Sequence, residues 1–195
     1  MCAAVVLAGG RARRLDGTSK PDLVVGDHTL LERTYAACRD IGAQLVVVVG
    51  PQLPSWTTPD GPPVVWTRED PPFAGPARAV AAGVAALADH PLASGARVAV
   101  LACDMPHVGT VLPVLAEAAD AGPGSVVAVT THVQWLLGIH PWKPLHDVCA
   151  ALPPGGANES VRALLAPLHP REVRVDPAGA EDIDTWVDLR RAREQ

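Results

Sequence analysis

A glycine pair followed by basic residues is the segment of this sequence that most clearly suggests a chemical role. Gly9 and Gly10 follow an apolar run directly, and three arginines and Lys20 come within the next ten residues. Paired glycines let the backbone turn sharply and bring its N–H groups close to an anion. A nucleoside triphosphate carries about four negative charges, and backbone donors together with side-chain cations can neutralise several of them. The pattern predicts a triphosphate-binding loop; a tight turn with solvated arginines is the structural alternative.

Better-known catalytic and nucleotide-binding motifs do not fit this chain. A Walker loop needs G-x-x-x-x-G-K-[ST], which residues 17–20 do not provide. A dinucleotide fold needs G-x-G-x-x-G and an acidic residue near the end of the second strand. Here the expected second strand is followed by Gly50-Pro51, with no acidic residue at its end. The sequence also has neither the histidine or cysteine spacing of a zinc site nor a Gly-x-Ser-x-Gly nucleophile elbow.

A single carboxylate, Asp104, follows another apolar run that ends at Leu101. Mg²⁺ keeps most of its waters in proteins and is held by one or two carboxylates plus substrate phosphates. An Asx-turn or a helix cap is the structural alternative, but the next helix is expected to begin about five residues later, too far for a cap. Asp104 is therefore a candidate metal ligand, and an Asx-turn remains the alternative role from the residues alone.

Short runs rich in β-branched residues alternate with segments of helical periodicity along the chain. The runs are apolar on consecutive residues, as strands covered on both faces must be. This alternation predicts right-handed crossovers and an α/β fold with a mainly parallel sheet and helices on both faces. Ligands bind beyond the carboxyl ends of such strands, where the glycine loop and Asp104 both lie. The expected strands are residues 3–7, 45–49, 98–101 and 126–129; the expected helices are 30–41, 77–87, 111–119 and 161–165.

Length and composition restrict the class of protein. The 195 residues, of which 48% are apolar and 19% charged, suit one compact domain spanning 1–195. A net charge of −5 argues against a nucleic-acid binder. The sequence contains no uninterrupted run of about 18 apolar residues, the length that would predict a membrane span. The start of the chain reads as a strand rather than a signal peptide. Four widely spaced cysteines are expected to be free thiols, which favours a cytoplasmic location.

Several segments resemble one enzyme family, in the same order along the chain. The first is Leu7-Ala8-Gly9-Gly10 followed by Arg14-Leu15 and Lys20, which resembles the signature loop of the small nucleotidyltransferases that include molybdenum cofactor guanylyltransferase. Gly75-Pro76 is similar to the start of the Gly-Pro-Leu-Ala-Gly turn of that family, and residues 103–106 resemble its Cys-Asp-x-Pro. Residues 182–189 resemble its closing Asn-Thr-Pro-Glu-Asp-Leu, so the resemblance covers nearly the whole chain.

The resemblance implies a single three-layer, Rossmann-like domain similar to nucleotide-diphospho-sugar transferases. It also implies a Mg²⁺-dependent enzyme that transfers GMP from GTP to the phosphate of a molybdopterin-type cofactor and releases pyrophosphate. Lys20, expected to be exposed, and Arg14 would hold the triphosphate, and Asp104 would bind the metal. The residues expected to bind the nucleotide are Leu7, Ala8, Gly9, Gly10, Lys20, Asp70, Gly75 and Asp104.

Departures from the family pattern leave the substrates open. Residues 77–79 replace the Leu-Ala-Gly of the family, Val49 or Gly50 stands where the guanylyl enzymes have asparagine, and residues 182–185 are closer to the cytidylyl enzymes. The alternatives are a cytidylyltransferase, a nucleotidyltransferase acting on a sugar or alcohol phosphate, or a nucleotide-binding accessory protein without turnover. Asp70 could also be an ordinary solvated loop residue. The expected partners are small molecules, with no nucleic acid and no membrane, and the protein is expected to be a monomer or homodimer.

Overall fold

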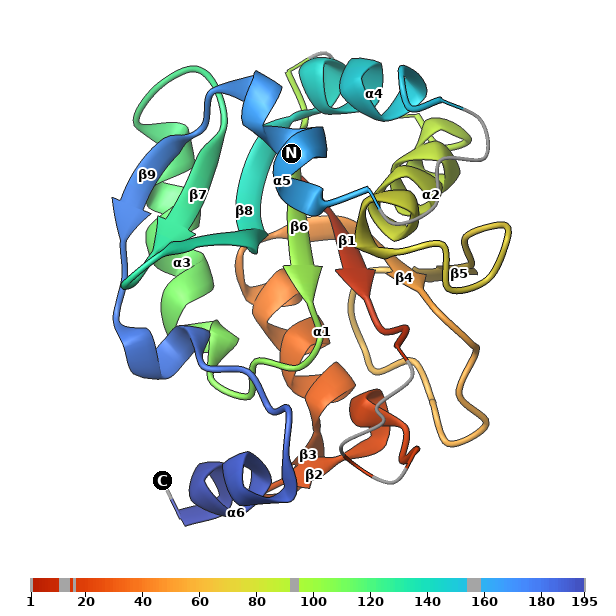
Figure 1. Ribbon diagram of the computed structural model, residues 1–195, viewed down its shortest axis with the longest axis vertical. Coiled ribbons are helices and arrows are strands. Elements are labelled where there is room, and N and C mark those ends of the chain that lie inside the picture. Colours follow the sequence, from red (N-terminus) through yellow and green to blue (C-terminus); the bar gives the residue numbers. More distant parts are fainter. Residues whose placement is uncertain (1, 11–14, 16, 92–94, 154–158, 195) are drawn as a thin grey trace.

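The computed structural model describes residues 2–10, 15, 17–91, 95–153 and 159–194. A seven-stranded sheet with the order β5-β4-β1-β6-β8-β7-β9 forms its centre (Figure 1). The strands are β1 (Cys2–Leu7), β4 (Ala43–Val49), β5 (Val64–Thr67), β6 (Arg97–Ala102), β7 (Val126–Val129), β8 (Val133–Pro141) and β9 (Arg171–Arg174), with a separate hairpin of β2 (Val24–Val25) and β3 (His28–Thr29). The helices are α1 (Leu30–Asp40), α2 (Pro76–Ala88), α3 (Val108–Asp120), α4 (Trp142–Ala150), α5 (Val161–Leu165) and α6 (Trp186–Glu194), and the 3-10 helices are η2 (Lys20–Asp22), η3 (Ala166–Leu168) and η4 (Pro177–Ala180).

The sheet is mainly parallel, as predicted, and β8 is its one antiparallel member among the described strands. The pairs β1–β4, β1–β6, β4–β5 and β7–β9 are parallel, whereas β8 runs antiparallel to both β6 and β7. β8 follows β7 after residues 130–132. A connection that short cannot return the chain to the end where β7 began, so the two strands form a hairpin.

All four predicted strands and all four predicted helices form, with ends that differ by a few residues. The helix expected at 111–119 begins earlier, at Val108, despite Pro113 in its interior. Helix α1 begins with a capping box between Thr29 and Glu32, and the Ser160 hydroxyl accepts a hydrogen bond that starts α5. β5, β8, β9, α4, α6 and the β2–β3 hairpin are additional to the prediction.

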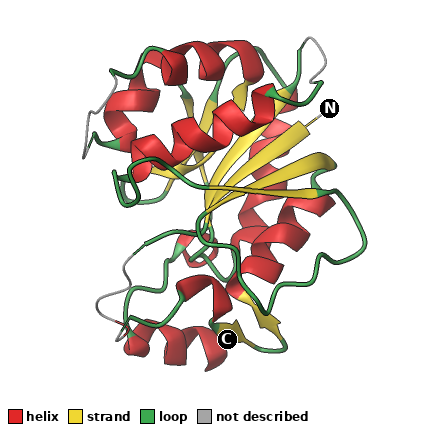
Figure 2. Cartoon of the chain, turned by 90° about the vertical axis from the view of Figure 1, so that its right-hand side faces the viewer, coloured by secondary structure: helices red, strands yellow, loops and turns green. Residues whose placement is uncertain are grey.

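Helices cover both faces of the sheet (Figure 2). Ala4 and Val6 of β1 belong to the apolar cluster that includes α1 and α3, while Ala3 and Val5 belong to the cluster on the other face, with α2, α4 and α5. This alternation follows from the two-residue period of a strand. At Gly83 of α2 a side chain would collide with Val5, so α2 packs very closely against β1. None of the described helices combines the length and apolar character needed to cross a bilayer.

A smaller apolar cluster lies beyond the carboxyl end of β1. It joins Leu15 of the glycine loop to Leu23 and Val25 near the β2–β3 hairpin, and to Ile183 and Leu189 around the start of α6. The cluster attaches the last described segment of the chain to the loop that follows the first strand. Figure 1 shows this arrangement, with α6 beside β2 and β3.

His140 of β8 is a polar residue buried within the fold. Its exposure is 0%, and within the described part of the chain neither ring nitrogen has a hydrogen-bond partner. Burial disfavours the charged imidazolium and lowers the pKa of His140 from 6.5 to about 4.

This pKa predicts a loss of stability in acid. Between pH 6.5 and about 4 the unfolded chain binds a proton at His140 that the folded chain does not, so the free energy of unfolding falls as the pH falls through this range. The full effect is about 3 kcal/mol. Chemical denaturation at pH 7, 6, 5 and 4 should show it as the difference between the wild type and His140→Leu. Because carboxylates titrate in both proteins, parallel pH dependences in the two would contradict the assignment to His140.

Candidate active site

The backbone around Gly9 and Gly10 forms one wall of the site at the end of β1. The Ala8 N–H donates to the carbonyl oxygen of Val49 at 2.9 Å, which ties the loop to the end of β4. Gly50 faces the same loop, and a Cβ there would lie 2.9 Å from the carbonyl carbon of Ala8. Gly10 has a φ of 146°, in the region that favours glycine. The glycines therefore match a tight turn at this point. Arg14, the other predicted cation of the loop, lies outside the described residues.

Lys20 begins helix η2 and points at two carboxylates. Its Nζ lies 3.1 Å from Asp104 Oδ2 and 2.6 Å from Asp184 Oδ1. Burial lowers the pKa of Lys20, but the two carboxylates outweigh that effect and hold the pKa above its usual value. Lys20 is therefore a positively charged group. The expectation that it is exposed is wrong, because only 21% of the side chain is accessible in this ion-paired position.

Asp104 lies two residues after the end of β6 and faces the cleft rather than capping a helix. The N–H of Cys103 donates to the carbonyl oxygen of Leu7 at 3.0 Å, which aligns the ends of β6 and β1. Helix α3 is preceded by His107, whose side chain makes no capping hydrogen bond. The alternative role of Asp104 as a cap is therefore not what the structure shows.

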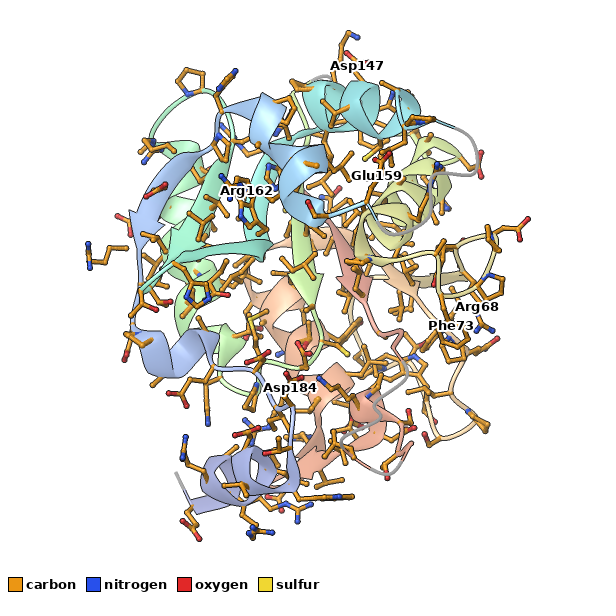
Figure 3. The ribbon with its side chains drawn as sticks, in the orientation of Figure 1. Arg68, Phe73, Asp147, Glu159, Arg162 and Asp184 are labelled. Carbon is orange, nitrogen blue, oxygen red and sulfur yellow. The ribbon has the colours of Figure 1, made fainter. Side chains whose placement is uncertain are left out.

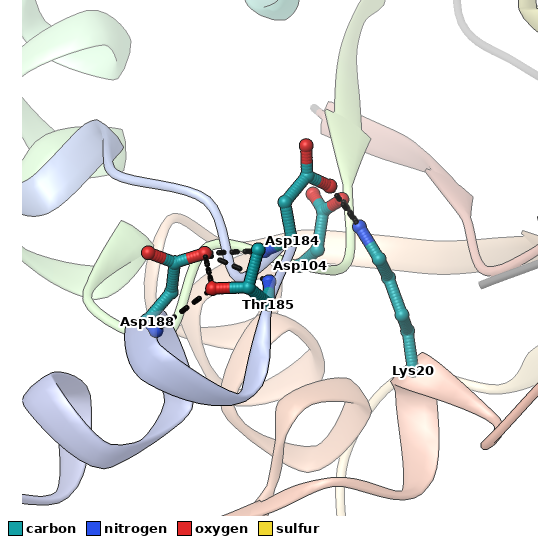
Figure 4. A network of polar contacts seen from close by, with 5 residues as sticks. All are labelled: Lys20, Asp104, Asp184, Thr185 and Asp188. Carbon is teal, nitrogen blue, oxygen red and sulfur yellow. Dashed lines mark hydrogen bonds and ion pairs between the residues drawn. The ribbon is translucent and has the colours of Figure 1, made fainter. Parts of the chain in front are cut away.

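Asp184 reaches the site from the far end of the sequence. The N–H of Ile183 donates to the backbone carbonyl of Asp104 at 2.9 Å and places the two aspartates side by side. Asp188 Oδ2 accepts hydrogen bonds from the N–H groups of Asp184 and Thr185, at 3.2 and 2.7 Å, and from the Thr185 hydroxyl at 2.8 Å (Figure 4). These bonds lower the pKa of Asp188. Asp188 thus fixes the turn that carries Asp184.

Three carboxylates at this point form a donor set suited to a divalent cation. One oxygen each from Asp104, Asp182 and Asp184 lie within 4.8 Å of one another. Burial, together with the charges of Asp104 and Asp184, raises the pKa of Asp182. Hard oxygen ligands of this kind are those that Mg²⁺ and Mn²⁺ prefer. A bound cation would relieve the repulsion among them, so the residues fit the predicted metal.

Two adjoining hollows meet at Lys20 and Asp104. The first, called here the loop cleft, has a volume of about 600 Å³ and extends over residues 17–21, Gly50, Arg68 and Asp184. The second, the helix cleft, has a volume of about 590 Å³ and extends toward Leu7, Gly75 and Leu136. Both are lined by Gly9, Gly10, Lys20, Glu69, Phe73 and Asp104. Each is large enough for a small organic ligand.

Most of the residues predicted from the sequence lie around these clefts. Leu7, Gly9, Gly10, Gly75, Lys20 and Asp104 line the helix cleft, and Ala8 lines the loop cleft. Asp70 is exposed and lines neither cleft, whereas its neighbour Glu69 lines both. The nucleotide contact of Asp70 remains a prediction.

The sequence reasoning did not assign roles to Asp182, Asp184 or Phe73. The Asp-x-Asp pattern is a usable signal for the first two, because residues two apart in an extended segment point to the same side. Phe73 has a φ of 64°, donates its N–H to Glu69 Oε1, and lies under the Arg68 guanidinium at 5.2 Å (Figure 3). No pattern of residue types in this proline-rich loop indicates that conformation.

A comparison with known protein families identifies the fold and the class of domain. The family of MobA-like NTP transferase domains matches residues 4–173 of the sequence. The chain belongs to this family. This MobA-like chain thus carries a nucleotidyltransferase domain, as the resemblance predicted. No relative among curated proteins matches it significantly.

Solved structures share the whole fold. Rv0371c from Mycobacterium tuberculosis H37Rv is 25% identical with a TM-score of 0.73, and the match covers 100% of both chains. Molybdopterin-guanine dinucleotide biosynthesis protein A from Archaeoglobus fulgidus is 21% identical with a TM-score of 0.71, covering 100% of this chain and 97% of the other. A 2-C-methyl-D-erythritol 4-phosphate cytidylyltransferase from Thermus thermophilus is 24% identical with a TM-score of 0.66, covering 97% and 96%. The Rv0371c structure has also been solved in complex with manganese.

Proposed function

We propose that this MobA-like protein is a Mg²⁺-dependent nucleotidyltransferase that transfers GMP from GTP to the phosphate of a molybdopterin-type cofactor. The observation that carries the proposal is the meeting of two ligand-sized clefts, of about 600 and 590 Å³, at Lys20 and Asp104. A transfer between two phosphorylated substrates needs two such spaces and a charged junction between them. Because the two clefts share lining residues at Lys20 and Asp104, a triphosphate in one and an acceptor phosphate in the other would meet there.

In the proposed reaction an oxygen of the acceptor phosphate attacks the α-phosphorus in line. A new P–O bond forms there, the bond between the α-phosphorus and the bridging oxygen breaks, and pyrophosphate leaves with that oxygen. Such a reaction depends on positioning and charge neutralisation rather than on a covalent enzyme group. The Gly9–Gly10 backbone and the Lys20 ammonium would orient the triphosphate, with Arg14 as a further cation.

Asp104, with Asp184 and Asp182, would hold the Mg²⁺ ion at the junction of the clefts. When bound, the ion would neutralise negative charge on the phosphates. Asp188 would act indirectly as a positioning residue, because its hydrogen bonds fix the backbone of Asp184. Apolar residues of the helix cleft, among them Leu7, Ala79 and Leu136, would exclude water from one side of the site.

Two observations support guanine and molybdopterin. The Leu7–Gly10 loop and the Gly75-Pro76 turn follow the guanylyl pattern, and Leu7, Gly9, Gly10, Gly75 and Pro76 line the helix cleft. The archaeal structure with the same fold is named as a molybdopterin-guanine dinucleotide biosynthesis protein. The residues at 182–185 and the cytidylyltransferase neighbours favour the second candidate, a cytidylyltransferase of the same mechanism.

The choice of base is testable by direct binding. We expect GTP to bind at least about tenfold tighter than CTP, a difference of about 1.4 kcal/mol. A site built to pair one base edge rejects another because its own polar groups are then left unpaired. Calorimetric titration of both nucleotides with Mg²⁺ measures the ratio. Equal affinities would overturn the guanylyl assignment and leave the transferase class standing, and tighter binding of CTP would favour the cytidylyl one.

Turnover is the test of the whole proposal. Purified protein with GTP, Mg²⁺ and molybdopterin should release pyrophosphate steadily and form the dinucleotide. A preceding thermal-shift screen of GTP, CTP, ATP and UTP identifies the nucleotide, since a ligand at 100 times its Kd stabilises the fold by about 2.7 kcal/mol. Nucleotide binding without pyrophosphate release, for molybdopterin and for sugar or alcohol phosphates alike, would leave the accessory-protein alternative.

A further inference from the structure

The ammonium group of Lys20 lies where a cation is expected. It makes ion pairs with Asp104 Oδ2 at 3.1 Å and Asp184 Oδ1 at 2.6 Å, and both of these residues belong to the three-carboxylate cluster. The pairs join positions 84 and 164 residues apart in the sequence, so they are a product of the tertiary fold (Figure 4). The Lys20 and Asp104 side chains are each only 21% exposed, which limits screening by water.

The same two carboxylates, Asp104 and Asp184, cannot serve the ammonium and a divalent ion equally well. Mg²⁺ binds oxygen at about 2.1 Å and places two ligand oxygens at most about 4.2 Å apart. The cluster oxygens lie within 4.8 Å of one another, so a small inward movement completes such a site. An ion bonded to Asp184 Oδ1, which is 2.6 Å from the Lys20 Nζ, would lie within about 4.7 Å of that nitrogen. Like charges at this distance repel, so the ion and the lysine compete.

We propose that Lys20 is a built-in competitor of the catalytic metal, and that metal binding releases its ammonium to the triphosphate. This inference rests on the proposed function and adds a coupling within that site. A metal ion that takes Asp104 and Asp184 removes the partners of Lys20, and the phosphates of the nucleotide replace them. Metal and nucleotide therefore bind with positive cooperativity, and the coupling is reciprocal.

The coupling has a consequence that a plain phosphate-binding lysine does not share. Removal of the Lys20 charge weakens triphosphate binding but strengthens binding of the metal alone. Lys20→Met keeps most of the side-chain length and deletes the charge. In nucleotide-free protein we expect it to bind Mn²⁺ at least about fivefold tighter than the wild type, the lower end of typical coupling effects.

The experiment measures free Mn²⁺ by electron paramagnetic resonance during titration of nucleotide-free protein. Lys143→Met is the matched control, because Lys143 is the other of the two lysines in the sequence and pairs with Asp147 on the exposed face of α4. This variant should bind Mn²⁺ as the wild type does. Lys20→Arg, which retains the charge, should stay close to the wild type. Circular dichroism verifies folding, and Lys20→Gln replaces the methionine variant if that variant does not fold.

The location of the ion is tested by a second substitution. Adding Asp184→Asn to Lys20→Met should abolish the gain in Mn²⁺ affinity. An unchanged or weaker Mn²⁺ affinity in the folded neutral variant, Lys20→Met or its replacement Lys20→Gln, would overturn the competition, as would a gain that persists without the Asp184 carboxylate. If wild-type protein still transfers a nucleotide in that case, the proposed function stands and only this inference fails.

Discussion

Asp104→Asn should retain nucleotide binding and lose metal-dependent turnover. Asparagine keeps the shape of the side chain but removes the charge that attracts and places the cation. Metal stabilisation of transition-state charge amounts to several kcal/mol, so we expect turnover to fall by about 1000-fold. Pyrophosphate release with Mg²⁺ and acceptor measures the loss, and calorimetry with GTP alone measures the binding that remains.

The matched control for this change is Asp147→Asn. Asp147 pairs with Lys143 on α4 and lines neither cleft, so its amide variant should keep wild-type turnover. Wild-type activity in Asp104→Asn would remove Asp104 from the metal site. A loss of GTP binding in the folded variant, equal to the loss of turnover, would instead give Asp104 a role in binding the nucleotide.

Lys20→Ala should weaken GTP binding severely while the protein remains folded. The loss of a charge-assisted contact with phosphate costs about 1.5–3 kcal/mol, which corresponds to about a 10- to 150-fold weaker affinity. Calorimetry with GTP, and with inorganic tripolyphosphate as a ligand that has no base, measures the effect. Both ligands should lose affinity by a similar factor, because Lys20 is expected to contact phosphate rather than guanine.

Folding and charge are controlled separately in this experiment. Lys143→Ala removes the only other lysine of the sequence and should leave both affinities unchanged. The Ala variant leaves the Asp104 and Asp184 carboxylates without their shared ammonium, so its thermal stability should be compared with and without Mg²⁺. Unchanged affinity for tripolyphosphate in folded Lys20→Ala would place the phosphates elsewhere.

The central strands and the glycine loop were predictable because their signals are local. Runs such as 45–49 and 98–101 are apolar on every residue, which indicates strands covered on both faces. Tight turns need glycine, so Gly9 and Gly10 mark the loop in the sequence itself. Lys20 and Asp104 stand close to these signals, and the structure places their side chains in contact.

The remaining part of the site depends on contacts between distant segments. Asp184 becomes a neighbour of Lys20 only because residues around α6 pack on Leu15 and because Ile183 bonds to the backbone of Asp104. The sequence pattern alone contains no information on that docking. The partial burial of Lys20 was missed for the same reason. Glu69 lines both clefts, whereas its neighbour Asp70, at the bend that follows, lines neither, so a one-residue choice decides which carboxylate reaches the clefts.

The way in which residues 182–194 are attached also makes the local stability of the site different from that of the sheet. Asp184 is held by a small apolar cluster, the backbone bond from Ile183, the Asp188 turn and the ion pair with Lys20, and Arg193 donates to the carbonyl oxygen of Val24. The seven strands, in contrast, pack between two large apolar clusters. Proteins open first where few apolar contacts hold a segment. Detachment of residues 182–194 would therefore leave a native-like sheet without Asp184. Mild denaturant should abolish activity before it changes the circular dichroism of the strands, and hydrogen exchange in this segment should be faster than in β1 and β6.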